Sequence, residues 1–197
     1  MTRTEGSQPE ERTQSKRADA ERNLTALLES AKAVFATSGV NAPAKEITDA
    51  AGLGVGTLYR HFPRRADLVM AVLHHEIDAC AQEASALRAA RAPYDALRHW
   101  VDRYVDLVGT KRGLAEALHS DEPAFAGLHE YVAERLEPAV ADLLADARAV
   151  GEIGGRADAR ELLYAVALLC QPVPTVSADY NRRMAMVFIE GLHSARS

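Results

Sequence analysis

Hydroxyl, imidazole and guanidinium groups follow one another closely in one short stretch of the chain. The stretch contains Thr57, Tyr59, Arg60, His61, Arg64 and Arg65. Such groups donate hydrogen bonds to phosphate oxygens, and a few of them at the start of a helix can also reach base edges. Side chains can make such contacts with a nucleic acid only if a rigid backbone holds them. The secondary structure around these residues therefore decides whether they form a nucleic-acid-binding site.

The apolar residues around this stretch fit two short helices that meet at an angle. Ile47, Ala51, Leu53 and Leu58 are spaced by four, two and five residues, which a single amphipathic helix would not give. Gly52 lies at the junction, where a helix often ends on a left-handed residue that glycine adopts without a clash. Two helices joined by a short glycine turn form a helix-turn-helix, whose second helix enters the major groove of DNA.

The start of the second helix carries two more glycines, Gly54 and Gly56, with Val55 between them. Glycine there indicates a place where the backbone comes close to a partner. The alternative is a helical corner in an ordinary bundle, with Tyr59 and Phe62 as core aromatics. A helix, a glycine and a helix do not by themselves decide between the two interpretations.

The run AGLGVGTLYRHFPRRADL, which begins at Ala51, closely resembles the DNA-binding signature of the TetR family of transcriptional regulators. In that family a Gly-Thr-Leu-Tyr-x-His-Phe run follows an Ala-Gly turn and leads into a long fourth helix. The resemblance covers residues 22–73 in detail. It favours the helix-turn-helix over the helical corner.

The resemblance implies roles for single residues. Thr57, Tyr59 and His61 would contact operator phosphates, Gly54 and Val55 would lie nearest the bases, and Arg65 stands where the family has a basic residue at the start of the fourth helix. The full set of DNA-binding candidates is Lys16, Arg17, Lys45, Gly54, Val55, Gly56, Thr57, Tyr59, Arg60, His61, Arg64 and Arg65.

Four positions depart from the family pattern. Thr48 replaces a small alanine, so its hydroxyl must bond back to its own helix or face outward. Gly54 replaces the usual serine cap, a change that costs only a few tenths of a kcal/mol. Val55 replaces a common polar residue and favours contact with thymine methyls. Pro43 and Ala44 stand where a threonine often binds a phosphate, and proline offers no donor.

The net charge of −5 argues against a nucleic-acid binder, but the charge is unevenly distributed. Residues 1–65 carry 10 Lys and Arg against 8 Asp and Glu, whereas the remaining residues carry 13 against 20. A weakly basic end on an acidic body fits a protein that presents one end to DNA. No apolar run approaches the roughly 18 residues that cross a bilayer, and no secretory signal is evident, so we expect a cytoplasmic protein without membrane contact.

Cysteine and histidine usage predicts no metal or redox centre. Cys80 and Cys170 lie far apart in apolar helical surroundings, which favours buried reduced thiols. His74 and His75 are adjacent and point to different helix faces, and His119 and His129 show no metal-ligand spacing. We expect no metal and no cofactor.

The remaining periodicity predicts an all-α fold of about nine helices. Residues 1–19 contain no large apolar residue after Met1, so they are predicted to form a flexible arm in which Lys16 and Arg17 can reach DNA. Residues 20–65 form the helix-turn-helix domain, and residues 66–197 a helical effector-binding and dimerisation domain. Its helices are predicted over 66–90, 94–109, 111–118, 125–150 (one helix or a pair meeting at Pro138), 158–171 and 177–192.

The TetR resemblance also implies a small-molecule effector and a homodimer formed by the last two helices. Aromatic side chains with polar tips, placed among aliphatic residues, are typical of ligand pockets but equally of ordinary cores. The pocket candidates are Trp100, Tyr104, His119, Phe125, His129, Tyr131, Tyr164 and Met184. The apolar interface candidates are Leu162, Leu163, Val166, Leu169, Val187 and Phe188.

These observations favour a homodimeric repressor that occupies a palindromic operator on double-stranded DNA and is released by its effector. An activator or a co-repressor-dependent regulator has the same sequence features. An enzyme or small-molecule carrier with a vestigial head is a third reading. It is disfavoured because no Ser/His/Asp arrangement, paired carboxylates or phosphate-binding loop is evident, and Gly52, Gly54 and Gly56 lack the strand of a dinucleotide fingerprint.

Overall fold

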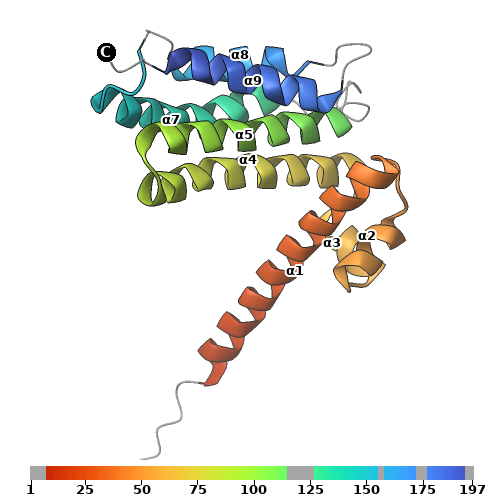
Figure 1. Cartoon of the computed structure of the whole chain (residues 1–197). Coiled ribbons are helices and arrows are strands. Elements are labelled where there is room, and N and C mark those ends of the chain that lie inside the picture. The colour runs from red at the N-terminus through yellow and green to blue at the C-terminus, as the bar shows by residue number, and fades with distance from the viewer. Residues whose placement is uncertain (1–7, 115–126, 155–157, 172–176, 194–197) are drawn as a thin grey trace, which may run out of the picture. The chain divides into compact units, whose positions relative to one another are not determined.

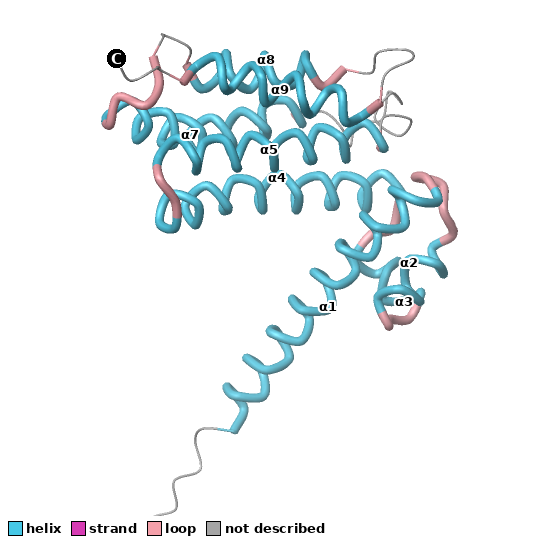
Figure 2. Tube along the Cα trace, in the orientation of Figure 1, coloured by secondary structure: helices cyan, strands magenta, loops and turns pink. Residues whose placement is uncertain are grey.

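The structure is a computed structural model that describes residues 8–114, 127–154, 158–171 and 177–193. In this part of the chain all the regular structure is helical, which confirms the all-α prediction (Figures 1 and 2). Eight helices are present, close to the predicted number. They are α1 Gln8–Ser38, α2 Ala44–Ala51, α3 Val55–His61, α4 Arg65–Ala90, α5 Pro93–Gly113, α7 Leu128–Ala149, α8 Ala159–Leu169 and α9 Ala178–Leu192.

The chain divides into two compact units, Met1–Val72 and Leu73–Ser197. The division falls inside α4, several residues beyond the predicted domain boundary at residue 66. The first turns of α4 belong with the head because Leu68 lines the same pocket as Leu58 and Phe62. We call Met1–Val72 the head and describe each unit separately.

The core of the head is formed by the C-terminal half of α1 and the short helices beside it (Figure 1). Leu27, Ala31 and Phe35 of α1 are buried, and their spacing of four residues places them on one face of the helix. Ile47 of α2 and Leu58 of α3 are buried as well. Each short helix is therefore anchored in the head by one buried aliphatic side chain.

Helix α1 begins at Gln8, so the prediction of a flexible arm over residues 1–19 is wrong for residues 8–19. Helix formation is costly to start and easy to extend, because each further residue adds one hydrogen bond. The buried half of α1 supplies the start, and the Glu, Arg and Gln residues before it are good helix formers. Residues 1–7 lie outside the described part of the chain.

Helix α5 is central to the second unit. It packs against α7, α8 and α9, and its buried Trp100 reaches a carbonyl oxygen of α4. Helix α7 is a single helix with Pro138 inside it, which settles the predicted choice between one helix and two. Cys80 and Cys170 are both buried thiols, as predicted. Among the described helices, none combines the length and the apolar character needed to span a bilayer.

Candidate nucleic-acid interface

The turn between α2 and α3 has the geometry that the sequence predicts. Gly52 adopts φ 67° and ψ 28°, the left-handed conformation that ends α2. Its N–H donates to the Asp49 carbonyl at 3.2 Å, and the Leu53 N–H donates to the Thr48 carbonyl at 2.9 Å. These bonds satisfy the last carbonyls of α2 and fix the direction in which α3 leaves.

Thr48, which departs from the family pattern, is completely buried in the head. Its Oγ1 donates to the Lys45 carbonyl at 3.1 Å, one helical turn earlier. The prediction that this hydroxyl bonds back to its own helix or faces outward is confirmed in the first form. A buried threonine is tolerated here because its polar atom has a partner.

The start of α3 is an open surface. Gly54 caps the helix without a side chain, and Val55 is 36% exposed. A Cβ atom built at Gly54 or Gly56 would meet no neighbouring heavy atom within 4 Å. Packing within the head therefore does not require glycine at either position, although glycine in a helix interior lowers stability.

The outward face of α3 carries the predicted phosphate-binding groups. Tyr59 is 55% exposed, so it is not the core aromatic of the alternative interpretation. His61 is also exposed. Arg60 folds back along the helix, where Nε donates to the Gly56 carbonyl and Nη2 donates to Thr57 Oγ1, both at 3.1 Å. Arg60 must therefore swing away from α3 before it can reach a phosphate.

Arg64 is paired at the start of α4. The Asp67 carboxylate accepts hydrogen bonds from the Arg64 backbone N–H at 3.1 Å, from Nε at 3.1 Å and from Nη2 at 2.6 Å. The Arg64 guanidinium lowers the pKa of the Asp67 carboxyl. A carboxylate at this position satisfies an orphan N–H of the first helical turn. Asp67 is a residue that the sequence analysis missed, although an acidic residue in a first turn is a known signal.

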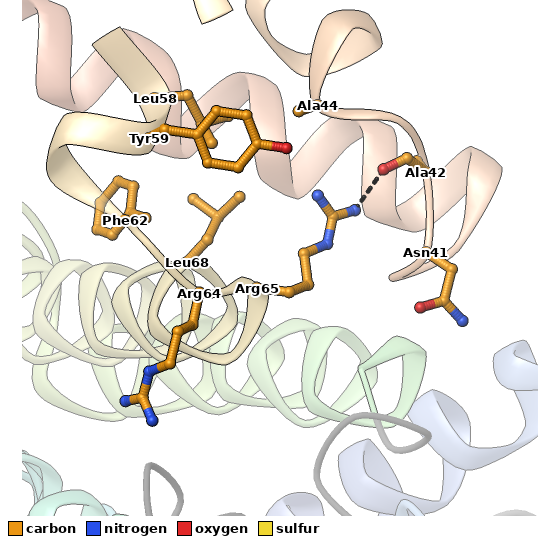
Figure 3. A pocket seen from close by; sticks show the side chains of 9 residues that line it. All are labelled: Asn41, Ala42, Ala44, Leu58, Tyr59, Phe62, Arg64, Arg65 and Leu68. Carbon is orange, nitrogen blue, oxygen red and sulfur yellow. Dashed lines mark hydrogen bonds between the residues drawn. The ribbon is translucent and has the colours of Figure 1, made fainter. Parts of the chain in front are cut away.

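Arg65 points the other way, into the head. Its Nε donates to the Val40 carbonyl at 2.6 Å. Its Nη2 donates to the Ala42 carbonyl, also at 2.6 Å, and this second bond is drawn in Figure 3. The guanidinium also lies 4.7 Å from the centroid of the Phe35 ring. Burial lowers the pKa of this guanidinium, but an arginine stays protonated in proteins.

A pocket of about 290 Å³ opens between the α1–α2 turn, α3 and the first turn of α4 (Figure 3). Its lining includes four residues with polar side chains and five with apolar ones. The lining residues are Asn41, Ala42, Ala44, Leu58, Tyr59, Phe62, Arg64, Arg65 and Leu68. The pocket lies within the head, beside the exposed face of α3.

The other basic candidates are placed as follows. Lys45 forms an exposed ion pair with Asp49, one turn along α2, at 2.5 Å. Such a pair is weak and opens readily. Lys16 and Arg17 lie on α1, and their side chains are outside the described part of the structure.

Two of the pocket candidates in the second unit belong to its core. Trp100 is fully buried, and its Nε1 donates to the Cys80 carbonyl at 2.8 Å. Tyr104 is 5% exposed, stacks on Trp100 and donates its hydroxyl to the Leu163 carbonyl at 3.3 Å. The polar tips of both side chains have hydrogen-bond partners inside the subunit.

The remaining pocket candidates within the described residues differ in their exposure. His129 and Tyr164 are exposed, so neither lines a cavity within the subunit. Tyr131 is half-buried, stacks on His74 at 4.0 Å and donates its hydroxyl to Asp78 at 2.9 Å. Met184 is half-buried on α9. His119 and Phe125 lie outside the described residues.

The interface candidates on α8 and α9 differ in their exposure. Leu162, Leu163 and Val166 are buried in the subunit's own core and offer little surface to a partner. Leu169 and Phe188 are half-buried, and Val187 is 58% exposed. Tyr164 and Leu168, four residues apart on the opposite face of α8, are 64% and 70% exposed.

Exposed apolar side chains form a stripe on α8 and α9, of which the sequence analysis named only Val187 as an interface candidate. Its large apolar members are Tyr164, Leu168, Tyr180 and Val187. Spacing of four residues on α8 and seven on α9 places the members of each helix on one face. The signal was present, because α8 is apolar on both faces, but periodicity does not tell which face enters the subunit core.

Comparison with solved structures identifies proteins with a similar fold. A TetR transcription regulatory protein from Mycobacterium vanbaalenii is 30% identical, has a TM-score of 0.70 and is matched over 90% of this chain and 99% of its own. A TetR transcriptional regulator from Streptomyces coelicolor is 27% identical, with a TM-score of 0.72 over 87% and 99%. RolR in complex with resorcinol shares the fold at 19% identity, with a TM-score of 0.54 over 91% of both chains.

Family comparison gives the same assignment. The bacterial regulatory proteins of the tetR family match residues 27–72, which lie within the head described above. The family described as "Transcriptional regulator SbtR-like, C-terminal domain" matches residues 92–194, more than half of the chain. No curated protein sequence matches the chain. The chain belongs to the TetR family and is a DNA-binding transcriptional regulator.

Proposed function

We propose that the chain acts as a homodimeric repressor that occupies a palindromic operator and is released by a small-molecule effector. The observation that carries the proposal is the face of α3. Val55, Tyr59 and His61 are exposed on a helix that Leu58 anchors in the head and that the Gly52 turn orients. A rigid helix with free polar and apolar side chains at its start suits entry into a major groove.

The DNA contacts follow from this face. Thr57, Tyr59 and His61 bind phosphates, and Val55 lies against a base edge, where an apolar side chain favours a thymine methyl. Arg60, Arg64 and Lys45 add phosphate contacts after they release their partners within the head. With about 6 to 10 phosphates neutralised per dimer, binding weakens steeply as salt rises.

The dimer forms through α8 and α9. The exposed stripe of Tyr164, Leu168, Tyr180 and Val187 is the apolar surface that a second copy would cover. Dimerisation has a physical motive, because one recognition helix reads few bases and two helices spaced by one DNA turn read a palindrome. We place this dimer on cytoplasmic DNA, with no cofactor.

The effector binds the second unit and favours one spacing of the two heads over the other. A useful switch needs a difference of about 1 to 3 kcal/mol in effector affinity between the two spacings. RolR shows that one protein of this fold holds resorcinol, a small phenol. For this chain Tyr131 and Met184 remain as half-buried lining candidates.

The experiment that tests the proposal is selection from genomic DNA. The purified protein is incubated with fragments of its own genome at physiological salt, and the retained fragments are sequenced. Enrichment of a palindrome supports a dimeric regulator and gives its targets. Enrichment that appears only when a metabolite extract is added supports co-repression instead, and no enrichment under either condition contradicts the proposal.

The sign of regulation needs a reporter assay. A repressor lowers transcription from a promoter that overlaps the enriched palindrome, because the bound dimer covers that DNA. An activator raises transcription from a promoter downstream of it. Deleting the gene and measuring the transcript next to the palindrome separates these outcomes.

A further inference from the structure

The turn between α1 and α2 depends on one side chain from a distant part of the head. Residues 39–43 connect the helices, and the side chains of Val40 and Ala42 are 3% and 6% exposed. Their carbonyl oxygens both accept hydrogen bonds from Arg65, the first residue of α4, across 25 and 23 residues of chain. The short bonds, both 2.6 Å, match the parallel N–H groups of a guanidinium.

The same guanidinium also touches α1. It lies over the Phe35 ring at 4.7 Å from the centroid, a distance typical of a cation–π contact. One side chain from α4 therefore contacts the last turns of α1 and the segment that leads into α2. The Nε atom of Arg65 carries a single hydrogen, and it donates this hydrogen to the Val40 carbonyl.

The neighbouring Arg64 has a different environment. Its side chain is 59% exposed, and its guanidinium pairs with Asp67 on its own helix. Arg65, in contrast, is half-buried and bonds to backbone atoms far away in sequence. The two adjacent arginines can therefore be compared directly in experiments, because Arg64 lies on the surface and Arg65 connects separate segments of the head.

We propose that Arg65 is a positioning residue for DNA binding, which holds the 39–43 segment and thereby the entry of α2, rather than a ligand of an operator phosphate. The inference rests on the proposed DNA-binding function. It replaces the role that the TetR resemblance gave to this position. Because α2 and α3 are joined by the fixed Gly52 turn, a shift at the entry of α2 also displaces the recognition helix.

Replacement by lysine separates the two roles. An ammonium group is a compact point charge on a flexible stem, which suits a phosphate oxygen well. It lacks the flat, forked donor that bridges two carbonyls and lies over a ring. Arg65→Lys therefore preserves a phosphate contact and loses a positioning one.

The test compares Arg65→Lys, Arg65→Gln and Arg64→Gln with the unaltered protein. Each is titrated with a mixed-sequence DNA duplex over a range of salt, at a temperature where all variants are folded. We expect both Arg65 variants to bind about tenfold more weakly, since each loses a charged hydrogen bond, with an unchanged salt slope. Arg64→Gln serves as the comparison and lowers the slope by about 0.9 for each head that engages DNA.

Hydrogen exchange measures the positioning itself without DNA. We expect both Arg65 variants to exchange faster in residues 39–51 while the buried part of α1 keeps its protection. Exchange that rises equally throughout the head would assign Arg65 a general stabilising role and overturn the inference. Full binding by Arg65→Lys, with weaker binding and a reduced slope for Arg65→Gln, would overturn it in favour of a phosphate ligand.

The two proposals fail in different ways. Absence of DNA binding by the unaltered protein contradicts the proposed function. The exchange measurement then still decides whether Arg65 holds the 39–51 segment.

Discussion

Two tyrosines show how differently the two units use the same side chain. Tyr59 on α3 is 55% exposed, whereas Tyr104 on α5 is 5% exposed and donates its hydroxyl to the Leu163 carbonyl. The first has a polar atom available for a partner outside the chain, and the second has used its polar atom within the fold. Residue type alone therefore does not separate a binding surface from a core, but burial and hydrogen-bond partners do.

The largest expected effect lies in the core of the second unit. Trp100→Ala removes a fully buried indole and the bond from Nε1 to the Cys80 carbonyl. We expect the free energy of unfolding to fall by about 3 to 5 kcal/mol in chemical denaturation. Trp100→Phe, which keeps most of the volume, should cost clearly less, and equal costs would show that Trp100 is not packed as described.

The next effect concerns the exposed stripe on α8 and α9. Leu168→Asp places a charge on a side chain that is 70% exposed in the single subunit. If a second copy covers the stripe, the dimer is weakened by about 2 kcal/mol or more, which sedimentation at several concentrations measures. Val150→Asp, at a 51% exposed position outside these helices, is the control and should leave the sedimentation unchanged.

The comparison between the two tyrosines can be tested by the same substitution at both sites. Tyr59→Phe should weaken DNA binding by about 1.5 to 3 kcal/mol, because a hydroxyl bond to a charged phosphate is lost. Its free energy of unfolding should change by less than about 0.5 kcal/mol.

Tyr104→Phe should do the opposite, with stability lowered by about 1 kcal/mol and DNA affinity intact. Denaturation and DNA titration are run on both variants. Parallel changes in both quantities would remove the distinction between the surface and the core.

The smallest effect is expected at Gly56. Alanine there gains up to about 1 kcal/mol of helix stability, and its Cβ atom meets no neighbour within 4 Å in the head. The added methyl group nevertheless projects from the helix that we place against DNA, so we expect a higher unfolding midpoint together with weaker DNA binding. A variant that is both more stable and fully active would show that DNA does not approach Gly56 closely.

The sequence was most informative where structure is local. Gly52 and Thr48 were predicted correctly because a left-handed helix end and a back-bonded hydroxyl involve only neighbouring residues. The partners of Arg65 are backbone carbonyls more than 20 residues away, and no side-chain identity at those positions signals them. Arg65 was therefore a DNA-binding candidate from the sequence, whereas the fold turns its side chain inward.

Helix faces were harder to predict than helices. Helix α8 was located correctly, but it has apolar residues on two faces, so the sequence did not show that Leu162 and Val166 enter the subunit's own core while Tyr164 and Leu168 stay exposed. A period of 3.6 residues shows which residues share a helix face. It does not show which of two apolar faces packs into the subunit's own core. Trp100 raised the same ambiguity, because an aromatic body with a polar tip suits a core and a pocket equally.

The two cysteines have a practical consequence for thiol chemistry. Both are fully buried, and burial raises the pKa of the Cys80 thiol to about 12. Since the thiolate is the reactive form, neither is expected to react with maleimide or methanethiosulfonate reagents in the folded protein. One cysteine introduced at exposed His61 would carry the label alone, so that spin–spin distances between two copies could report the separation of the recognition helices directly.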